Sequence, residues 1–229
     1  MNELELTGRA RTHVVQRDDL RAAFHPQALA AFLAMREAAA RAGLALTALS
    51  AFRDFDAQLS IWNRKFRGER PLLAADGSVR DHAALSESEL VDAILEWSAL
   101  PGTSRHHWGT DIDVFDAAAL PEGYRVQLIP PEYAANGVFA RLSGWLDQNL
   151  HRFGFFRPYD AARGGVQPEP WHLSYAPVSR IALAQLSPDL VARTVRETQI
   201  LGRDIILARM DQVFERYVRN VAAAPEQVA

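Results

Sequence analysis

Residues 104–113 read Ser-Arg-His-His-Trp-Gly-Thr-Asp-Ile-Asp, and residues 169–172 read Glu-Pro-Trp-His. The first stretch ends in an alternating segment, residues 110–115, that predicts a strand with Asp111 and Asp113 on one face. The second opens another alternating segment, residues 171–175, in which His172 points to the side opposite Trp171. We therefore expect two strands that each present polar side chains to a common site.

Histidines and carboxylates in these two stretches predict a metal site. The chain has no cysteine, so a metal would have to be held by His, Asp and Glu. Two histidines, one carboxylate and an open position for water are what a hydrolytic zinc requires. We expect His106, Asp113 and His172 to bind one Zn2+ per chain. Glu169 lies between Pro168 and Pro170, three residues before His172, and is expected to act as a general base on the metal-bound water.

The pattern Ser104-x-His106-x-x-Gly109-x-x-x-Asp113, followed by Glu169-x-Trp171-His172, resembles the paired signature of the zinc D-alanyl-D-alanine carboxypeptidase family. That family shares its fold with lysostaphin-type peptidases and the hedgehog signalling domain. Upstream, residues 50–58 read Ser-Ala-Phe-Arg-Asp-Phe-Asp-Ala-Gln and resemble the family's Ser-Gly-Tyr-Arg-Ser segment that ends in Gln. The resemblance covers roughly residues 40–176. Asp111 departs from the pattern, where a small residue such as alanine is usual, and leaves open which aspartate binds the metal.

The resemblance implies a small α+β domain with a central antiparallel sheet flanked by helices. It implies a zinc-dependent carboxypeptidase that removes the C-terminal D-alanine from peptidoglycan-type stem peptides. Arg53 would polarise the scissile carbonyl and stabilise the oxyanion, a role that suits a guanidinium at a strand-to-helix junction. Gln58, Ser104 and Trp171 would bind substrate. A peptidoglycan endopeptidase and a non-catalytic zinc-binding module of the same fold remain alternatives, and D,D and L,D specificity are not separated.

Periodicity and capping residues predict helices that begin near Pro26, Asp54, Ser86 and Phe139, with strands near residues 44–50, 110–115 and 171–175. From Pro177 onward the sequence is helical, and Ser187-Pro188 is a second helix-start signal. We expect a peptidase domain over residues 1–176. Residues 177–229 are expected to form a helical extension that either packs on the same domain or makes a homodimer contact.

Composition narrows the class of protein further. Hydrophobic residues make up 48% of the chain and charged residues 23%, which is typical of a globular domain. The net charge of −3 and the lack of a basic stripe argue against nucleic-acid binding, so the expected partner is a peptide substrate. No apolar run reaches membrane-spanning length. The N-terminus does not resemble a secretory signal, which predicts a cytoplasmic protein, or a periplasmic one if an export signal has been removed.

Overall fold

The computed structural model, described here for residues 1–225, contains a four-stranded antiparallel sheet in the order β3-β4-β6-β5. Its strands are β3 (Leu46–Ser50), β4 (Asp111–Asp116), β6 (His172–Tyr175) and β5 (Phe155–Phe156). In the register between β4 and β6, Asp113 is paired with His172. The two sequence stretches quoted first therefore lie on neighbouring central strands, and the expected α+β fold class is confirmed.

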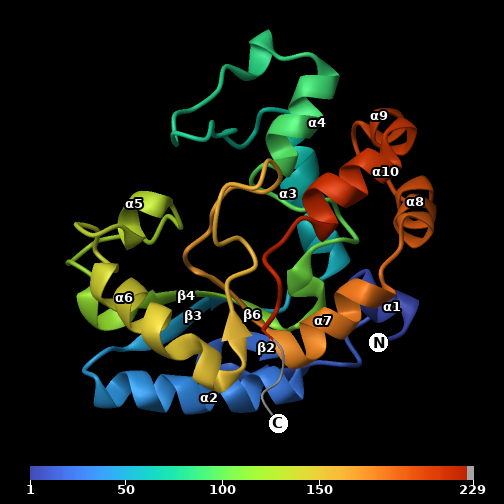
Figure 1. Cartoon of the computed structure of the whole chain (residues 1–229). Coiled ribbons are helices and arrows are strands. Elements are labelled where there is room, and N and C mark those ends of the chain that lie inside the picture. The colour runs from blue at the N-terminus through green and yellow to red at the C-terminus, as the bar shows by residue number, and fades with distance from the viewer. Residues whose placement is uncertain (226–229) are drawn as a thin grey trace.

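One face of this sheet is apolar and covered by helices. Ile112 and Val114 alternate with Asp111 and Asp113 along β4 and are fully buried, as is Leu173 on β6. They pack in one core cluster with α2 (Pro26–Arg41) and α6 (Ala140–Asn149). Both helices lie along the same side of the sheet in Figure 1. Period-two alternation thus separates an apolar face from a polar face that carries Asp111 and Asp113.

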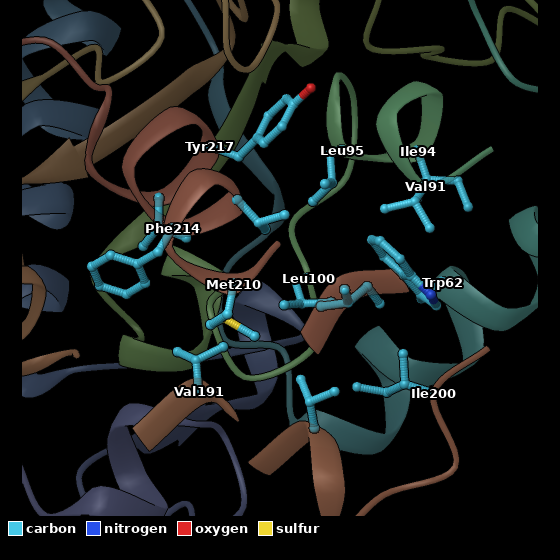
Figure 2. Close-up of a cluster of buried hydrophobic side chains, with 14 of the residues drawn as sticks. Trp62, Val91, Ile94, Leu95, Leu100, Val191, Ile200, Met210, Phe214 and Tyr217 are labelled. Carbon is cyan, nitrogen blue, oxygen red and sulfur yellow. The ribbon is translucent and has the colours of Figure 1, made fainter. Parts of the chain in front are cut away.

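A second core lies on the other side of the molecule. It joins α3 (Phe55–Phe66) and α4 (Glu87–Leu95) to the C-terminal helices α8 (Pro188–Arg196), α9 (Arg203–Ala208) and α10 (Met210–Val213) and the π-helical turn Phe214–Arg219. Figure 2 shows Trp62 of α3 facing the side chains of α4 and of these C-terminal elements. The indole of Trp62 also donates to the carbonyl of Leu201 at 3.0 Å. The apolar residues of these C-terminal helices that belong to this core are therefore buried within the chain.

Helix boundaries follow local capping. The side chain of Asp54 accepts from the backbone N–H of Ala57 and starts α3. Ser86 and Glu89 form a capping box at the start of α4. Ser187 caps α8, which begins with Pro188. These helix starts agree with the predictions from the sequence.

The structure adds short elements that periodicity did not indicate. A hairpin of β1 (Val15–Arg17) and β2 (Ala22–Phe24) forms a separate two-stranded sheet. Short helices α1 (Glu3–Leu6) and α5 (Pro130–Tyr133) are also present. The helix expected from Pro177 onward is α7 (Ala176–Gln185), which follows β6 directly. Single 3-10 turns occupy Asp18–Leu20, His82–Ala84, Arg105–Trp108, Ala117–Ala119 and Leu150–Phe153. Among the residues described, none of the helices has the length and apolar character needed to cross a membrane.

Candidate metal centre

Three elements bring His106, Asp113 and His172 together. His106 lies in the 3-10 turn that precedes β4, Asp113 lies within β4, and His172 is the first residue of β6. Each offers one ligand atom, and these atoms all lie within 4.8 Å of one another in a buried position. Nε2 of His106 is 3.3 Å from Asp113 Oδ2, and Nδ1 of His172 is 3.3 Å from Asp113 Oδ1. The structure thus assembles the predicted ligand set.

Hydrogen bonds on the far side of each imidazole determine which nitrogen faces the centre. Nδ1 of His106 donates to the carbonyl oxygen of Ala51 at 2.8 Å, which leaves Nε2 free toward Asp113. Nε2 of His172 donates to Asp111 Oδ1 at 2.9 Å, which leaves the lone pair of Nδ1 facing the centre. Such outer partners fix both the tautomer and the orientation of a ligand histidine.

Asp111 and Asp113, both on β4, have different surroundings. Both oxygens of Asp111 are engaged, because they also accept from Arg105 Nε at 2.8 Å and from the hydroxyls of Thr110 and Ser174 at 2.7 and 3.1 Å. Oδ1 of Asp113 is buried and accepts no hydrogen bond from the described residues. A buried carboxylate oxygen without a donor is costly unless a cation satisfies it. This difference favours Asp113 over Asp111 as the metal ligand.

Charge interactions keep Asp113 ionised. Burial by itself would raise the pKa of the Asp113 carboxyl, but the adjacent His106 and His172 outweigh burial and hold it well below its usual range. Burial opposes the charged form of His172, but the adjacent carboxylates of Asp111, Asp113 and Glu169 outweigh burial and raise its pKa. The site is therefore rich in negative charge around its two imidazoles. That charge distribution, with two imidazoles and one carboxylate as donors, fits a divalent cation such as zinc.

Glu169 lies next to the ligand group without being part of it. Its Oε2 is 3.3 Å from Nδ1 of His172, and its backbone N–H donates to the carbonyl of Tyr159 at 3.0 Å. The flanking residues Pro168 and Pro170 restrict the backbone to extended conformations. The carboxylate is thus held at the edge of the centre, where it could exchange a proton with a reacting group.

Arg53 is held from several directions. Its backbone N–H donates to the carbonyl of His106 at 3.1 Å, and its own carbonyl accepts from Nδ1 of His107 at 2.7 Å. His107 is fully buried, and burial lowers its pKa to about 3, so the ring stays neutral. The guanidinium donates to Gln58 Oε1 at 2.9 Å and to Ser50 Oγ at 3.2 Å. The cation is therefore oriented by neutral partners.

The predicted substrate-binding residues occupy different positions. Ser104 and Trp171 line a cavity of about 340 Å³ that also contains the metal-ligating group. Gln58 is buried behind Arg53, where its oxygen accepts from the guanidinium and its amide donates to the carbonyl of Ala99 at 2.7 Å. Gln58 is 1% exposed, so its side chain offers almost no surface for a direct contact with substrate. Gln58 therefore orients the guanidinium of Arg53 from behind.

Three further cations, Lys65, Arg70 and Arg105, line the same cavity, and none of them was among the site residues predicted from the sequence. Lys65 lies two turns after Gln58 on α3, and helical spacing from Gln58 was the only signal that could have placed it on this face. Burial lowers the pKa of Lys65 to about 8, although Glu169 opposes the shift. The wall of the cavity is therefore more cationic than the motifs alone indicate.

Two curated proteins are similar to this chain in sequence. A protein of Haemophilus influenzae with no described function is 39% identical over 121 residues, which cover 52% of this chain and 92% of the relative. A D-alanyl-D-alanine carboxypeptidase of Enterococcus faecalis is 35% identical over 82 residues, 34% of this chain and 25% of that protein.

Solved structures are similar in fold. VanYB in complex with D-alanine-D-alanine matches with a TM-score of 0.53 and 19% identity, covering 83% of this chain and 92% of that one. A VanY D,D-pentapeptidase in complex with Zn(II) matches with a TM-score of 0.52 and 22% identity, over 75% and 84% of the two chains. The LD-carboxypeptidase LdcB matches with a TM-score of 0.52 and 18% identity, over 92% and 80%.

The family model for VanY, described as D-alanyl-D-alanine carboxypeptidase, matches residues 21–178. That span contains the two signature stretches, the segment around Arg53 and the whole four-stranded sheet. The C-terminal helices from α8 onward lie beyond it. As its motifs predicted, the chain belongs to the VanY family of D-alanyl-D-alanine carboxypeptidases.

Proposed function

We propose that this peptidase uses one zinc ion to remove the C-terminal D-alanine from peptidoglycan-type stem peptides. The observation that carries the proposal is the convergence of three ligand atoms within 4.8 Å, with the Glu169 carboxylate 3.3 Å from one of the ligand histidines. The Zn(II) complex and the D-alanine-D-alanine complex of its structural relatives support the same metal and substrate class here.

The donor set defines how the metal would be held. His106 would bind it through Nε2, His172 through Nδ1 and Asp113 through its carboxylate, three protein ligands that leave a position open. When bound there, zinc would supply Lewis acidity and lower the pKa of water. Asp111 would orient His172 from behind, because Nε2 of that ring already donates to it.

The remaining chemistry belongs to the chain's own side chains. Glu169 would accept a proton at its carboxylate and return it to the nitrogen of the leaving D-alanine. Arg53 would donate to the oxygen of the scissile carbonyl as negative charge develops there. Its fixed orientation, held by Gln58 and Ser50, means that little reorganisation is needed. The presence of both a base and an arginine at the centre speaks against a non-catalytic module.

Mass spectrometry of stem tetrapeptides and pentapeptides after incubation with the protein tests the proposal. Loss of one terminal alanine, abolished by chelator and restored by zinc, is the expected result. Loss from the pentapeptide alone indicates D,D specificity, and loss from the tetrapeptide indicates L,D specificity. Internal cleavage of cross-linked peptides with no release of alanine would replace the carboxypeptidase by an endopeptidase. Zinc binding without any cleavage would replace it by an interaction module.

A further inference from the structure

Lys65 is a cation without an anionic partner on the wall of the reaction cavity. It lies one turn after Ile61 on α3, and both side chains line the cavity that holds the metal-ligating group. Its ammonium donates to Ser98 Oγ at 2.7 Å. Among residues 1–225, no carboxylate oxygen lies within the 4.0 Å that defines an ion pair with Lys65 Nζ. Its one close polar partner is therefore a neutral hydroxyl.

Removing an ammonium group from water without a counter-charge costs free energy. Most of the cations in this chain that are partly buried do have an anion, as Arg105 has Asp111 and Arg80 has Glu96. The carboxylates nearest to the cavity, Asp113 and Glu169, are turned toward His172. Lys65 therefore keeps at least one donor available for an anion that enters the cavity from outside.

Other cationic groups in the cavity are less suited to bind such an anion. Arg105 is already paired with Asp111 at 2.8 Å. Arg53 is engaged by Gln58 and Ser50, and under the proposed function it faces the scissile carbonyl. Arg70 is exposed, so its attraction for an anion is weakened by water and salt. Lys65 is only partly exposed and is anchored through Ser98, so its charge is positioned.

We propose that Lys65, anchored by Ser98, binds the C-terminal carboxylate of the peptide substrate and is the residue that distinguishes a free chain end from an internal or amidated one. The proposal rests on the proposed function, and it assigns the carboxylate contact that Gln58 is poorly placed to make. A carboxylate is the anion that every free peptide C-terminus carries. An amide offers no charge to pair with the ammonium.

The test uses the zinc-loaded full chain and two N-acetylated pentapeptides that end in D-alanine-D-alanine, one as the free acid and one as the C-terminal amide. We expect the wild-type protein to prefer the free acid. The Lys65→Met variant is expected to lose roughly 10- to 100-fold in kcat/KM for the free acid, mainly through KM, because charge-assisted hydrogen bonds are of that strength. Its kcat/KM for the amide should stay at the wild-type value, and Lys65→Arg should recover part of the preference.

Arg64→Met is the matched control. Arg64 is the neighbouring residue on α3, its side chain is 43% exposed and it pairs with Glu69 outside the cavity. This variant removes the same charge and should leave the preference unchanged. An equal loss for both peptides in Lys65→Met, or no loss for either, would overturn the assignment. So would a loss of preference in Arg64→Met as large as that in Lys65→Met.

Isothermal titration calorimetry with the same two peptides tests the carboxylate contact of Lys65 independently of the proposed carboxypeptidase activity. The measurement uses zinc-loaded Glu169→Gln protein with and without Lys65→Met, so it needs no turnover. A preference for binding the free acid that disappears with Lys65→Met supports the carboxylate contact even if no alanine is ever released. Absence of that difference overturns it even if the enzyme cleaves stem peptides.

Discussion

Nε2 of His172 donates a 2.9 Å hydrogen bond to Oδ1 of Asp111, a residue that stands where the family usually has a small side chain. Asp111 is in turn paired with the buried guanidinium of Arg105 at 2.8 Å. Burial would raise the pKa of the Asp111 carboxyl, but Arg105 and His172 outweigh it and keep the carboxyl ionised. The chain therefore supports one metal-ligating histidine with a buried carboxylate and its counter-ion.

Replacing Asp111 with Asn is expected to weaken zinc binding by roughly 10- to 100-fold while leaving the site able to fill at saturating zinc. The amide keeps an acceptor for His172 but loses the charge that balances Arg105. Competition with a chromophoric chelator measures the affinity, and thermal unfolding checks that the variant is folded. An unchanged affinity in a folded variant would show that His172 does not depend on Asp111.

Metal analysis of the purified protein is expected to find about one zinc per chain, and His106→Ala, Asp113→Ala and His172→Ala should each lose most of it. Three protein ligands define an open site, and the loss of one leaves too few. His151→Ala serves as the control, because this histidine is exposed on the 3-10 turn Leu150–Phe153. Full occupancy in any of the three ligand variants would remove that residue from the set.

Part of the proximity of Asp113 and His172 could be predicted from the alternation along each strand, and the register between the strands supplies the rest. Alternation along β4 and β6 determines which side chains share a face, and the antiparallel register then sets Asp113 opposite His172. The helix starts at Asp54, Ser86 and Ser187 were also readable, because a cap acts within three residues.

Features that depend on distant contacts could not be predicted. The anchoring of Lys65 needs Ser98, which is 33 residues away. Gln58 resembles a substrate ligand in its motif, but its amide is held by the carbonyl of Ala99, 41 residues away. The β1–β2 hairpin was missed because the exposed β1 strand, with no buried residue, shows no alternation of apolar and polar side chains.

Substitution of Glu169 by Gln should retain zinc and fold, and should lower kcat by at least about 10²-fold. The amide keeps the size of the side chain but cannot accept the proton, and general-base assistance is typically worth 10²- to 10⁴-fold. Steady-state release of D-alanine, measured beside metal analysis of the same sample, checks both parts. If the variant loses its zinc instead, Glu169 is a ligand rather than a base.

The affinity for free-acid substrate is expected to fall as pH rises through about 8. Burial lowers the pKa of Lys65 to about 8, Glu169 opposes the shift, and Arg70 and Arg53 add to it. Lys65 is therefore charged below that pH and neutral above it, while the substrate carboxylate stays ionised throughout. KM for the N-acetylated free acid should rise between pH 7 and 9.5 toward the value of Lys65→Met, and KM for the amide should stay constant. A parallel rise for both peptides would assign the effect to another group.

The lowered pKa of Lys65 also affects the free energy of unfolding, and this effect serves as a folding control. The pKa of Lys65 is lower in the folded chain than its ordinary value of 10.5, so the folded state binds fewer protons between about pH 8 and 10.5. The contribution of Lys65 to stability is therefore least favourable below pH 8 and improves as pH rises through that window. Lys65→Met should be at least as stable as the wild type at pH 7, on the order of 1–3 kcal/mol more so. Chemical denaturation at pH 7 measures this difference.

Gly165 links the C-terminal helices to the segment that carries Glu169. A Cβ at this position would collide with the backbone carbonyl oxygen of Arg216, which lies in the π-helical turn Phe214–Arg219. Two hydrogen bonds hold the segment, one from Arg216 Nε in this turn to the carbonyl of Gly164 at 2.6 Å, and one from Nδ2 of Asn220, just after the turn, to the carbonyl of Arg163 at 2.8 Å. Glu169 follows only four residues later. Elements beyond the family match therefore position the segment that leads to the proposed base.

Gly165→Ala is expected to lower the free energy of unfolding by roughly 1–3 kcal/mol, the usual cost of forcing an extra carbon into a packed site. It should also lower kcat while zinc content stays full, because the displaced segment carries Glu169 but no metal ligand before His172. Gly144→Ala is the control, since Gly144 lies in α6 with no atom within 4 Å of an added Cβ, and alanine there should be neutral or slightly stabilising. Chemical denaturation, metal analysis and D-alanine release on the two variants decide the matter. Wild-type turnover in a destabilised Gly165→Ala protein would mean that the C-terminal helices stabilise the fold without positioning Glu169.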